Sequence, residues 1–325
     1  MKAIVWTRYG SPDVLILREV ETPVPKDNEV LVKVLAASLN AADVETMRGP
    51  FIIRLAGLLR PAYRIPGSDI AGRVEAVGRN VTQFQPGDAV FGDLSVCGFG
   101  AFAEYACAPE SALAKKPERM AFEEAAAYPQ AAVLAVQGLR YGGQVQPGQK
   151  VLINGAGGGV GTFAVQIAKK FGADITAVDS AQKLDMLHSI GADHVIDYTR
   201  EDFTKNGQLY DLVLDVVVHR SVSDYARALS PEGACGMVGG SMARIFMAML
   251  LGARISGKEN KKVGIVMHQP NEKEDLVLLK ELFYSGDVVP VIDRRYPLSE
   301  VADAFQYLEE GHAKGKVIVA VEDKS

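Results

Sequence analysis

A run of glycines at residues 155–161 has the spacing that suits dinucleotide binding. It reads GAGGGVG and lies between an expected strand at 150–154 and an expected helix at 160–171, the context in which such a loop is informative. There the backbone can approach a pyrophosphate closely, and the helix N-terminus offers unpaired N–H groups. A strict GxGxxG is absent, and a purely structural turn stays open. The predicted cofactor contacts are Gly158, Gly159, Val160 and Gly161.

An acidic residue after the next expected strand adds a second signal. Asp179 lies 18 residues beyond Gly161, where a carboxylate can accept hydrogen bonds from an adenosine ribose. It could equally cap the helix expected from Ala181, and the two roles are compatible. Lys183 could reach a 2′-phosphate or lie solvated on that helix. The sequence thus predicts NAD(P)H, with Asp179 favouring NADH and Lys183 favouring NADPH.

The elements that must position these residues fall into two parts. A chain of 325 residues suits two domains at roughly 100–200 residues each. The first ~115 residues show strand patterns between Gly and Pro turns, for example at 30–34, 71–77 and 102–106, which predicts a small barrel or sandwich. An apolar, Arg-dotted insert at 50–66 is either a lid over a cleft or an ordinary packed connection.

From about residue 121 helices alternate with strands, which predicts a doubly wound parallel sheet. A helical pattern at 122–141 comes first. Six strands are expected at 150–154, 175–178, 194–196, 212–214, 235–238 and 263–266. The tail predicts helices at 272–284 and 299–310, a strand near Val291 and a last strand at 316–321.

Composition excludes several classes of protein. The net charge of −5 gives no electrostatic reason to bind nucleic acid or an anionic membrane. The longest apolar run, 245–253, is nine residues, whereas a membrane span needs about 20. The start lacks the apolar core of a signal peptide, and three widely spaced cysteines fit a reducing compartment. We therefore expect a cytoplasmic protein with a small-molecule substrate.

Six ordered motifs, taken together, resemble one family across essentially the whole chain. They lie at 38–43, 67–72, 86–90, 156–161, 191–193 and 311–316. The sequence resembles the medium-chain dehydrogenase/reductases, in their zinc-independent, quinone oxidoreductase-like branch. The resemblance implies an α/β fold in which a Rossmann domain (121–285) is inserted into a GroES-like catalytic domain (1–120 with 286–325). It also implies a homodimer, for which we expect the edge strand near 263–266 to pair across a twofold axis.

The residues argue against a metal. Zinc needs three or four converging Cys, His or carboxylate ligands, and no cysteines cluster here. Zinc-dependent relatives carry Cys where this chain has Asn40, and His-Glu where it has Ser68-Asp69. For catalysis the resemblance points instead to two residues, Asn40 and Asp43. The Asn40 amide could donate a hydrogen bond to a developing oxyanion. A loop-stabilising amide and a helix N-cap are the alternatives for these two.

The resemblance also implies further cofactor contacts. Tyr198 would lie on the adenosine side, where it favours NADPH. The nicotinamide side would involve Val238, Gly239, Gly240, Val266, Met267 and Lys316. Two departures from the family pattern stand out: Leu134 replaces a usual Thr, and Val218 replaces a usual Gly.

The leading hypothesis is an NAD(P)H-dependent, zinc-independent oxidoreductase that transfers hydride to a quinone, an enone or another carbonyl-activated substrate. An alcohol dehydrogenase or enoyl-thioester reductase is the alternative within enzymes. A basic entrance made by Arg48, Arg54, Arg60 and Arg64 would favour an acyl-carrier substrate. A non-catalytic, nucleotide-binding regulatory protein is the alternative from another class.

Overall fold

The computed structural model describes residues 1–49, 60–240, 244–245, 247–248, 250 and 260–321. The chain divides into two compact units. Unit 1 comprises Met1–Gln130, Pro270–Leu276 and Ile292–Ser325, and unit 2 comprises Ala131–Gln269 and Val277–Val291. The expected lid at 50–66 lies largely outside the described residues, as does Arg54. Among the helices of the described residues, none has the length and apolar character needed to cross a membrane.

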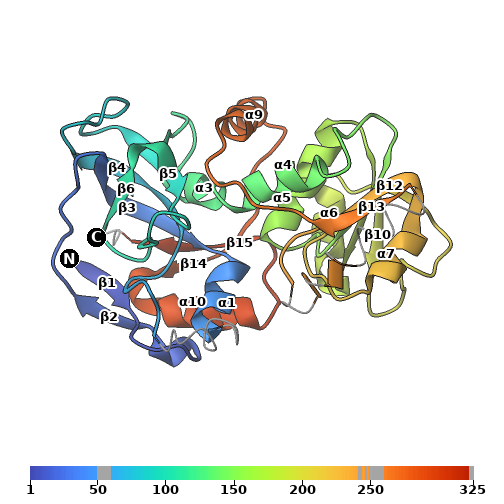
Figure 1. The fold of residues 1–325 in the computed structure, drawn as a ribbon, viewed down its shortest axis with the longest axis horizontal. Helices are drawn as coiled ribbons and strands as arrows, with labels where there is room; N and C mark the ends of the chain where they lie inside the picture. The colour runs from blue at the N-terminus through green and yellow to red at the C-terminus, as the bar shows by residue number, and fades with distance from the viewer. Residues whose placement is uncertain (50–59, 241–243, 246, 249, 251–259, 322–325) are drawn as a thin grey trace. The chain divides into compact units, whose positions relative to one another are not determined.

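Unit 1 is built on a seven-stranded sheet beside a two-stranded one (Figure 1). The large sheet has the order β14-β15-β3-β4-β5-β7, and β6 also pairs with β3. Its strands are β3 (Glu29–Leu39), β4 (Asp69–Val77), β5 (Ala89–Asp93), β6 (Tyr105–Pro109), β7 (Ala114–Lys115), β14 (Ile292–Pro297) and β15 (Lys316–Ala320). The small sheet pairs β1 (Lys2–Val5) with β2 (Ile16–Glu19). Short 3-10 turns are η1 (Pro12–Val14), η2 (Glu110–Ala112) and η4 (Leu298–Glu300).

The last strand of the chain completes the sheet begun near its start. β15 pairs antiparallel with β3, with Val317 opposite Leu39. This register places Lys316, the first residue of β15, beside the end of β3. The following helix α1 (Ala41–Arg48) begins immediately after Asn40. Two residues 276 positions apart in the sequence are thereby brought together.

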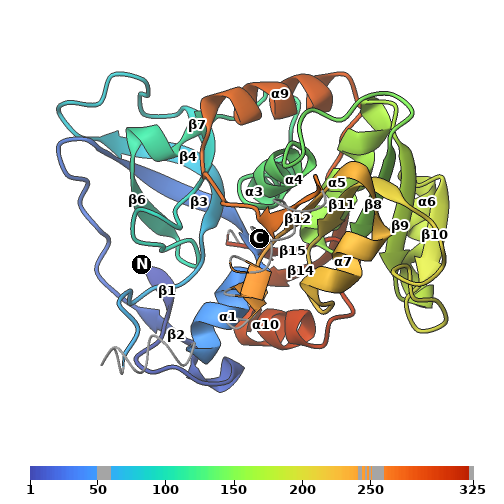
Figure 2. The same ribbon diagram turned by 45° about the vertical axis from the view of Figure 1, so that its right-hand side comes forward.

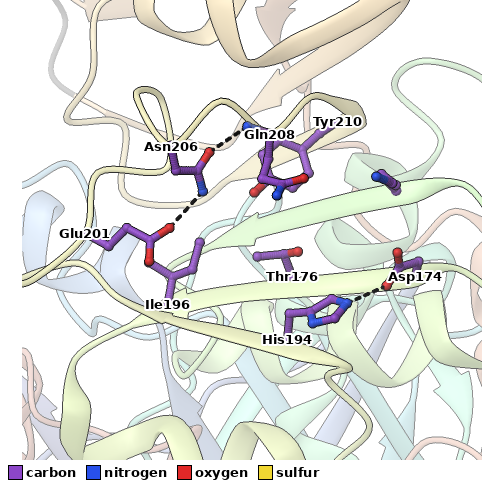
Figure 3. A pocket seen from close by; sticks show the side chains of 9 residues that line it. Asp174, Thr176, His194, Ile196, Glu201, Asn206, Gln208 and Tyr210 are labelled. Carbon is purple, nitrogen blue, oxygen red and sulfur yellow. Dashed lines mark hydrogen bonds and ion pairs between the residues drawn. The ribbon is translucent and has the colours of Figure 1, made fainter.

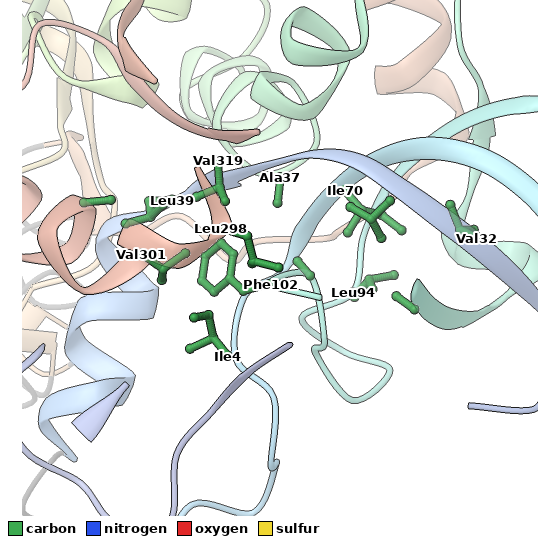
Figure 4. Close-up of a cluster of buried hydrophobic side chains, with 14 of the residues drawn as sticks. Ile4, Val32, Ala37, Leu39, Ile70, Leu94, Phe102, Leu298, Val301 and Val319 are labelled. Carbon is green, nitrogen blue, oxygen red and sulfur yellow. The ribbon is translucent and has the colours of Figure 1, made fainter. Parts of the chain in front are cut away.

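Apolar side chains from both ends of the chain form the core of unit 1 (Figure 4). Phe102 and Phe305 meet edge to face, with ring centroids 5.8 Å apart, and both are fully buried. Phe305 belongs to helix α10 (Val301–Glu309), which contacts α1. Arg48 joins the two helices by a bidentate pair with Glu309, at 2.6 and 2.8 Å. Arg48, which the sequence analysis proposed for a basic entrance, is thus paired with Glu309 and holds two helices together.

Unit 2 is a six-stranded parallel sheet with the order β10-β9-β8-β11-β12-β13, and Figure 2 shows β8, β9 and β10 side by side. The strands are β8 (Lys150–Asn154), β9 (Asp174–Asp179), β10 (His194–Asp197), β11 (Tyr210–Asp215), β12 (Leu229–Met237) and β13 (Lys262–Ile265). The helices include α4 (Ala131–Leu139), α5 (Gly159–Lys170), α6 (Leu184–Ser189) after η3 (Ala181–Lys183) and α7 (Val222–Ala228). Helix α9 (Lys273–Tyr284) belongs to unit 1 up to Leu276 and to unit 2 from Val277. The six predicted strands and the doubly wound topology are confirmed.

One predicted helix is in fact two. The pattern at 122–141 folds as α3 (Phe122–Ala127) and α4, separated by a turn that contains Pro129. Proline lacks the N–H that a continuing helix needs, and its ring clashes with the carbonyl one turn earlier. Helix α3 packs against β3, β4 and β15. Unit 1 therefore extends to Gln130, ten residues beyond the boundary expected at residue 120.

Truncation of Phe305 should test this core. We expect Phe305→Ala to lower the free energy of unfolding by about 3–5 kcal/mol, because a fully buried ring leaves a cavity. Trp6, the single tryptophan, is buried in the same core, so its fluorescence in a urea titration reports on unit 1. Val24→Ala, at a side chain 84% exposed, is the control and should cost below about 0.5 kcal/mol. Equal effects of the two changes would contradict this assignment of the core.

Candidate active site

The glycine loop of unit 2 connects the end of β8 to the start of α5. The N–H groups of Gly155 and Ala156 both donate to the carbonyl of Val178 in β9, at 3.0 and 3.1 Å. These bonds hold the loop at the carboxyl edge of the sheet. Gly158 is the N-cap of α5 and has extended backbone. The first turn of α5 contains Gly159, Val160 and Gly161. It therefore begins where the chain passes from the sheet, at β8, to the helical layer.

Two glycines of this loop have different physical reasons to be glycine. A Cβ on Gly161 would lie 2.4–2.5 Å from backbone atoms of residues 155 and 156, so Gly161 lets the helix pack closely against the loop. A Cβ on Gly158 would meet only the carbonyl of Gly155, at an ordinary 3.5 Å. The protein itself does not require a bare backbone at Gly158. A phosphate at the α5 N-terminus would need this space, so the loop fits a dinucleotide.

Asp179 ties the glycine loop to the end of β9. Its Oδ2 accepts the N–H of Gly157 at 2.8 Å, and its Oδ1 accepts the N–H of Ser180 at 2.8 Å. The ammonium of Lys183 lies 3.4 Å from Oδ1, and both side chains are buried. Lys183 is therefore not the solvated lysine that the sequence left open. Ser180, not Asp179, is the residue that precedes the helical turn η3.

The other predicted cofactor contacts of unit 2 gather at the same edge of the sheet. The N–H of Tyr198 donates to the carbonyl of Asp179 at 3.2 Å, and its side chain is more than half exposed. The segment after β12 holds Val238, Gly239 and Gly240, and the segment after β13 holds Val266 and an exposed Met267. Strand order reverses between β8 and β11, and ligands of doubly wound sheets bind outside the carboxyl ends at such a point.

Val218 adopts an unusual backbone conformation beside this edge. Its φ is +54°, a region that β-branched residues rarely occupy, and its side chain is buried. Asp215 holds the turn, because one carboxylate oxygen accepts the N–H groups of Val217 and Val218 at 2.8 and 2.7 Å. The hydroxyl of Tyr225 and the amide of Asn154 donate to its other oxygen. The second departure from the family pattern, Leu134, is buried in α4.

Unit 1 contains a separate buried polar cluster around Asn40. The ammonium of Lys316 donates to Asn40 Oδ1 at 2.6 Å and to the carbonyl of Leu39 at 3.1 Å. Asn40 Nδ2 donates to Asp69 Oδ2 at 2.9 Å. Lys316 and Asp69 are almost completely buried and lie 3.6 Å apart. The structure thus brings together two predicted site residues, Asn40 and Lys316, through Asp69, which the sequence analysis named only as a replacement for a zinc ligand.

Asp43 lies in the same cluster at the start of α1. Its carboxylate accepts the backbone N–H of Asn40 at 2.8 Å, so its contacts support the capping role. Burial raises the pKa of the Asp43 carboxyl to about 7, with the nearby carboxylates of Asp69 and Asp93 adding to the shift. Burial likewise raises the pKa of Asp69 to about 6, although the Lys316 ammonium opposes it. Burial lowers the pKa of Lys316 against the pull of these carboxylates.

Sequence reasoning missed Asp69 and Asp215 as organisers of their loops. Both were readable as carboxylates within or at the end of apolar strands, in the sequences SDIAG and DLVLD. A carboxylate in such a place must find donors, because an isolated buried charge is very costly. Across the described part of the chain, no three His, Cys, Asp or Glu side chains converge as a metal site would need.

A hollow of about 280 Å³ opens elsewhere in unit 2 (Figure 3). Lys150, Asp174, His194 and Tyr210, which line it, are the first residues of four strands. The amino ends of parallel strands lie at the edge opposite their carboxyl ends, so this hollow is distinct from the glycine loop. His194 and Asp174 pair across it at 3.2 Å. None of the predicted site residues lines it.

Comparison with known proteins places these features among dehydrogenases and reductases. A family model described as alcohol dehydrogenase GroES-like domain matches residues 26–118. A second, described as zinc-binding dehydrogenase, matches residues 190–319. The first match covers β3 to β7, and the second covers the last four strands of unit 2, β10 to β13, together with β14 and most of β15.

Individual relatives cover nearly the whole chain. The chain is 38% identical to a 2-methylene-furan-3-one reductase of Solanum lycopersicum, over 98% of this chain and 79% of the relative. It is 36% identical to a chloroplastic NADPH-dependent alkenal/one oxidoreductase of Arabidopsis thaliana, with the same coverage. The solved quinone oxidoreductase from Coxiella burnetii superposes with a TM-score of 0.88 at 30% identity, over 99% of each chain.

The raised pKa of Asp43 predicts a pH dependence of stability. A carboxyl with a pKa of 3.8 when unfolded and about 7 when folded stabilises the fold fully at low pH, and this contribution is lost as pH rises towards 7. We expect Asp43→Asn to flatten the fall in unfolding free energy between pH 4 and pH 7, measured with urea and Trp6 fluorescence. The exposed Asp303→Asn is the control. An unchanged slope in Asp43→Asn would show that Asp43 is ionised throughout.

Proposed function

Because this chain belongs to the medium-chain dehydrogenase/reductase family, in its quinone oxidoreductase-like branch, we propose that it reduces a quinone, an enone or another carbonyl-activated small molecule without zinc. It is an NAD(P)H oxidoreductase of that family, so the non-catalytic alternative is set aside. One observation carries the zinc-free assignment. A buried ammonium, that of Lys316, lies against the residues that replace the zinc ligands of relatives.

The residues around Asn40 do not fit a zinc ion. Asn40, Ser68 and Asp69 stand where zinc-dependent relatives carry Cys, His and Glu. The Asn40 carbonyl oxygen and the Asp69 carboxylate both face the Lys316 ammonium, at 2.6 and 3.6 Å. A divalent cation at these oxygens would have to displace a cation that is itself fully buried. We infer that the positive charge of the lysine occupies the electrostatic role that a metal has in those relatives.

The carboxyl edge of unit 2 supports the binding of NAD(P)H. Gly158 and the α5 N-terminus would hold the pyrophosphate, and Asp179 with Lys183 would face the adenosine ribose. The bound cofactor would supply the hydride. Lys183 neutralises part of the Asp179 charge at 3.4 Å, which reduces repulsion of a 2′-phosphate and supports the use of NADPH as well as NADH.

The substrate class rests on the relatives and on the chemistry of Asn40. Two similar proteins act, by their names, on a furanone with an exocyclic methylene and on alkenals and alkenones. Reduction of such conjugated carbonyls develops negative charge on the carbonyl oxygen. An amide N–H in a buried, preorganised site stabilises that charge strongly. We assign this donor role to Asn40, and no catalytic step to Asp43.

Assembly and compartment are further parts of the proposal. Among the strands that the structure describes, β13 is at the end of the unit 2 sheet, and an edge strand of this kind supports pairing with a second copy in a homodimer. The three cysteines are free, two half-buried and one buried, which supports a reducing compartment such as the cytoplasm.

A substrate panel with and without a chelator tests the function. With NADPH or NADH, we expect turnover of simple enones and quinones, followed as loss of cofactor absorbance. Rates should be unchanged after exhaustive chelation, and metal analysis should find far less than one zinc per chain. Stoichiometric zinc, or loss of activity on chelation that zinc restores, would refute the zinc-free assignment. A cofactor that binds without turnover on any panel member would refute the proposed reaction.

The glycine loop gives a matched pair of variants. Gly158→Val has room in the protein, so we expect a folded chain whose NADPH affinity falls at least about tenfold, since a lost charge-assisted hydrogen bond costs about 1.5–3 kcal/mol. Gly161→Val collides with backbone and should instead lower the melting temperature. Titration of NADPH fluorescence and circular dichroism separate the two effects. Wild-type affinity in a folded Gly158→Val would show that the loop is only a turn.

Asp179 and Lys183 should set the choice between the two cofactors in opposite directions. We expect Asp179→Ser to raise the ratio of NADPH to NADH affinity, because it removes a negative charge beside the 2′-position. Lys183→Met should lower that ratio by roughly tenfold or more, because it removes the cation. Lys205→Met, at an exposed lysine, is the control. If the ratio of NADPH to NADH affinity changed in the same direction in both variants, the 2′-phosphate of NADPH would have to bind elsewhere.

A further inference from the structure

The polarity of the Asn40 amide is fixed by its neighbours. Lys316 can only donate hydrogen bonds, and the Asp69 carboxylate, when ionised, can only accept them. Asn40 Oδ1 must therefore face the ammonium, at 2.6 Å, and Nδ2 must face Asp69, at 2.9 Å. Rotation of the amide by half a turn would place like groups together on both sides. The orientation thus has an electrostatic cause outside Asn40 itself.

One hydrogen of Nδ2 remains weakly held. The first hydrogen is used by Asp69, and the second faces Ser68 Oγ at 3.4 Å, longer than a normal N–H···O bond. The short contact at Oδ1 involves a charged donor, which withdraws electron density from the amide. Linked hydrogen bonds strengthen one another, so the second N–H becomes a better donor than that of an isolated amide.

We propose that Lys316 is a positioning residue for the reduction: its buried ammonium fixes and polarises the Asn40 amide, which presents its second N–H to the carbonyl oxygen of the substrate. This inference rests on the proposed function, because it gives Lys316 its effect through the donor role of Asn40. It differs from the role expected for Lys316 from sequence, a contact to the nicotinamide. The Nζ atom lies within reach of Asn40, Leu39 and Asp69, all in unit 1.

A double-mutant cycle between Lys316 and Asn40 separates these roles. Turnover of an enone from the panel is measured for wild type, Lys316→Met, Asn40→Ala and the double variant, with NADPH affinity from fluorescence titration. We expect Lys316→Met to lower kcat at least tenfold while KM changes less than threefold, since the lost interaction is made in the transition state. In the Asn40→Ala background, Lys316→Met should lower kcat less than twofold further.

Removal of the lysine leaves the buried Asp69 carboxylate without its paired cation, so Lys316→Met can fail to fold. The variant Lys316→Met with Asp69→Asn removes that charge, and Trp6 fluorescence in urea checks its stability. It should fold and still show the loss of kcat, because the amide has lost its cation. The exposed Lys314→Met is the matched control and should retain wild-type kcat.

The outcomes are distinguishable. Weaker NADPH binding in Lys316→Met, by tenfold or more, would assign the lysine to the cofactor and overturn the proposal. Independent losses of kcat in the cycle would also overturn it, because a lysine that only stabilises the fold acts additively with Asn40. Recovery of wild-type kcat in the double variant Lys316→Met with Asp69→Asn would also overturn the proposal. Wild type and Lys314→Met inactive on the whole panel would instead refute the proposed function.

Discussion

A single buried ammonium group holds the polar centre of unit 1 together. Lys316 enters the cluster from the last strand of the chain and meets the end of β3 and the start of β4, which are far from it in sequence. Burial of a charge is costly unless it is paired and hydrogen-bonded, and here Asn40, Leu39 and Asp69 supply the partners. The antiparallel pairing of β15 with β3 is what places the lysine there.

In unit 2, buried carboxylates hold the loops of the predicted site together. Asp179 and Asp215 end the strands β9 and β11 and accept backbone N–H groups from neighbouring loops. The glycine loop and the turn that holds Val218 are thereby fixed before any ligand binds. Such preorganisation lowers the entropic cost of binding a large, flexible dinucleotide. The strained φ of Val218 persists because two bonds to Asp215 hold its turn.

Much of the fold was accessible from the sequence, because it follows from local patterns. All six strands of the parallel sheet, and the strand-to-helix context of the glycine loop, were predicted from apolar runs and glycine spacing. The division of 122–141 into two helices was missed, although Pro129 carried the signal. The extension of unit 1 to Gln130 was not readable, because it depends on α3 packing against strands from both ends of the chain.

The sequence by itself determined which residue types are present for chemistry: a loop of glycines, an acid after the second strand of the parallel sheet, and the polar residues Asn40, Ser68 and Asp69. Only the tertiary structure decided their partners. Lys183 reads as a solvated lysine or a phosphate ligand in sequence, and Lys316 reads as a cofactor contact. Strand register and packing buried both ammonium groups beside carboxylates. The physical reason is that long-range contacts exclude water from a charged group, and this exclusion sets the environment of the charge.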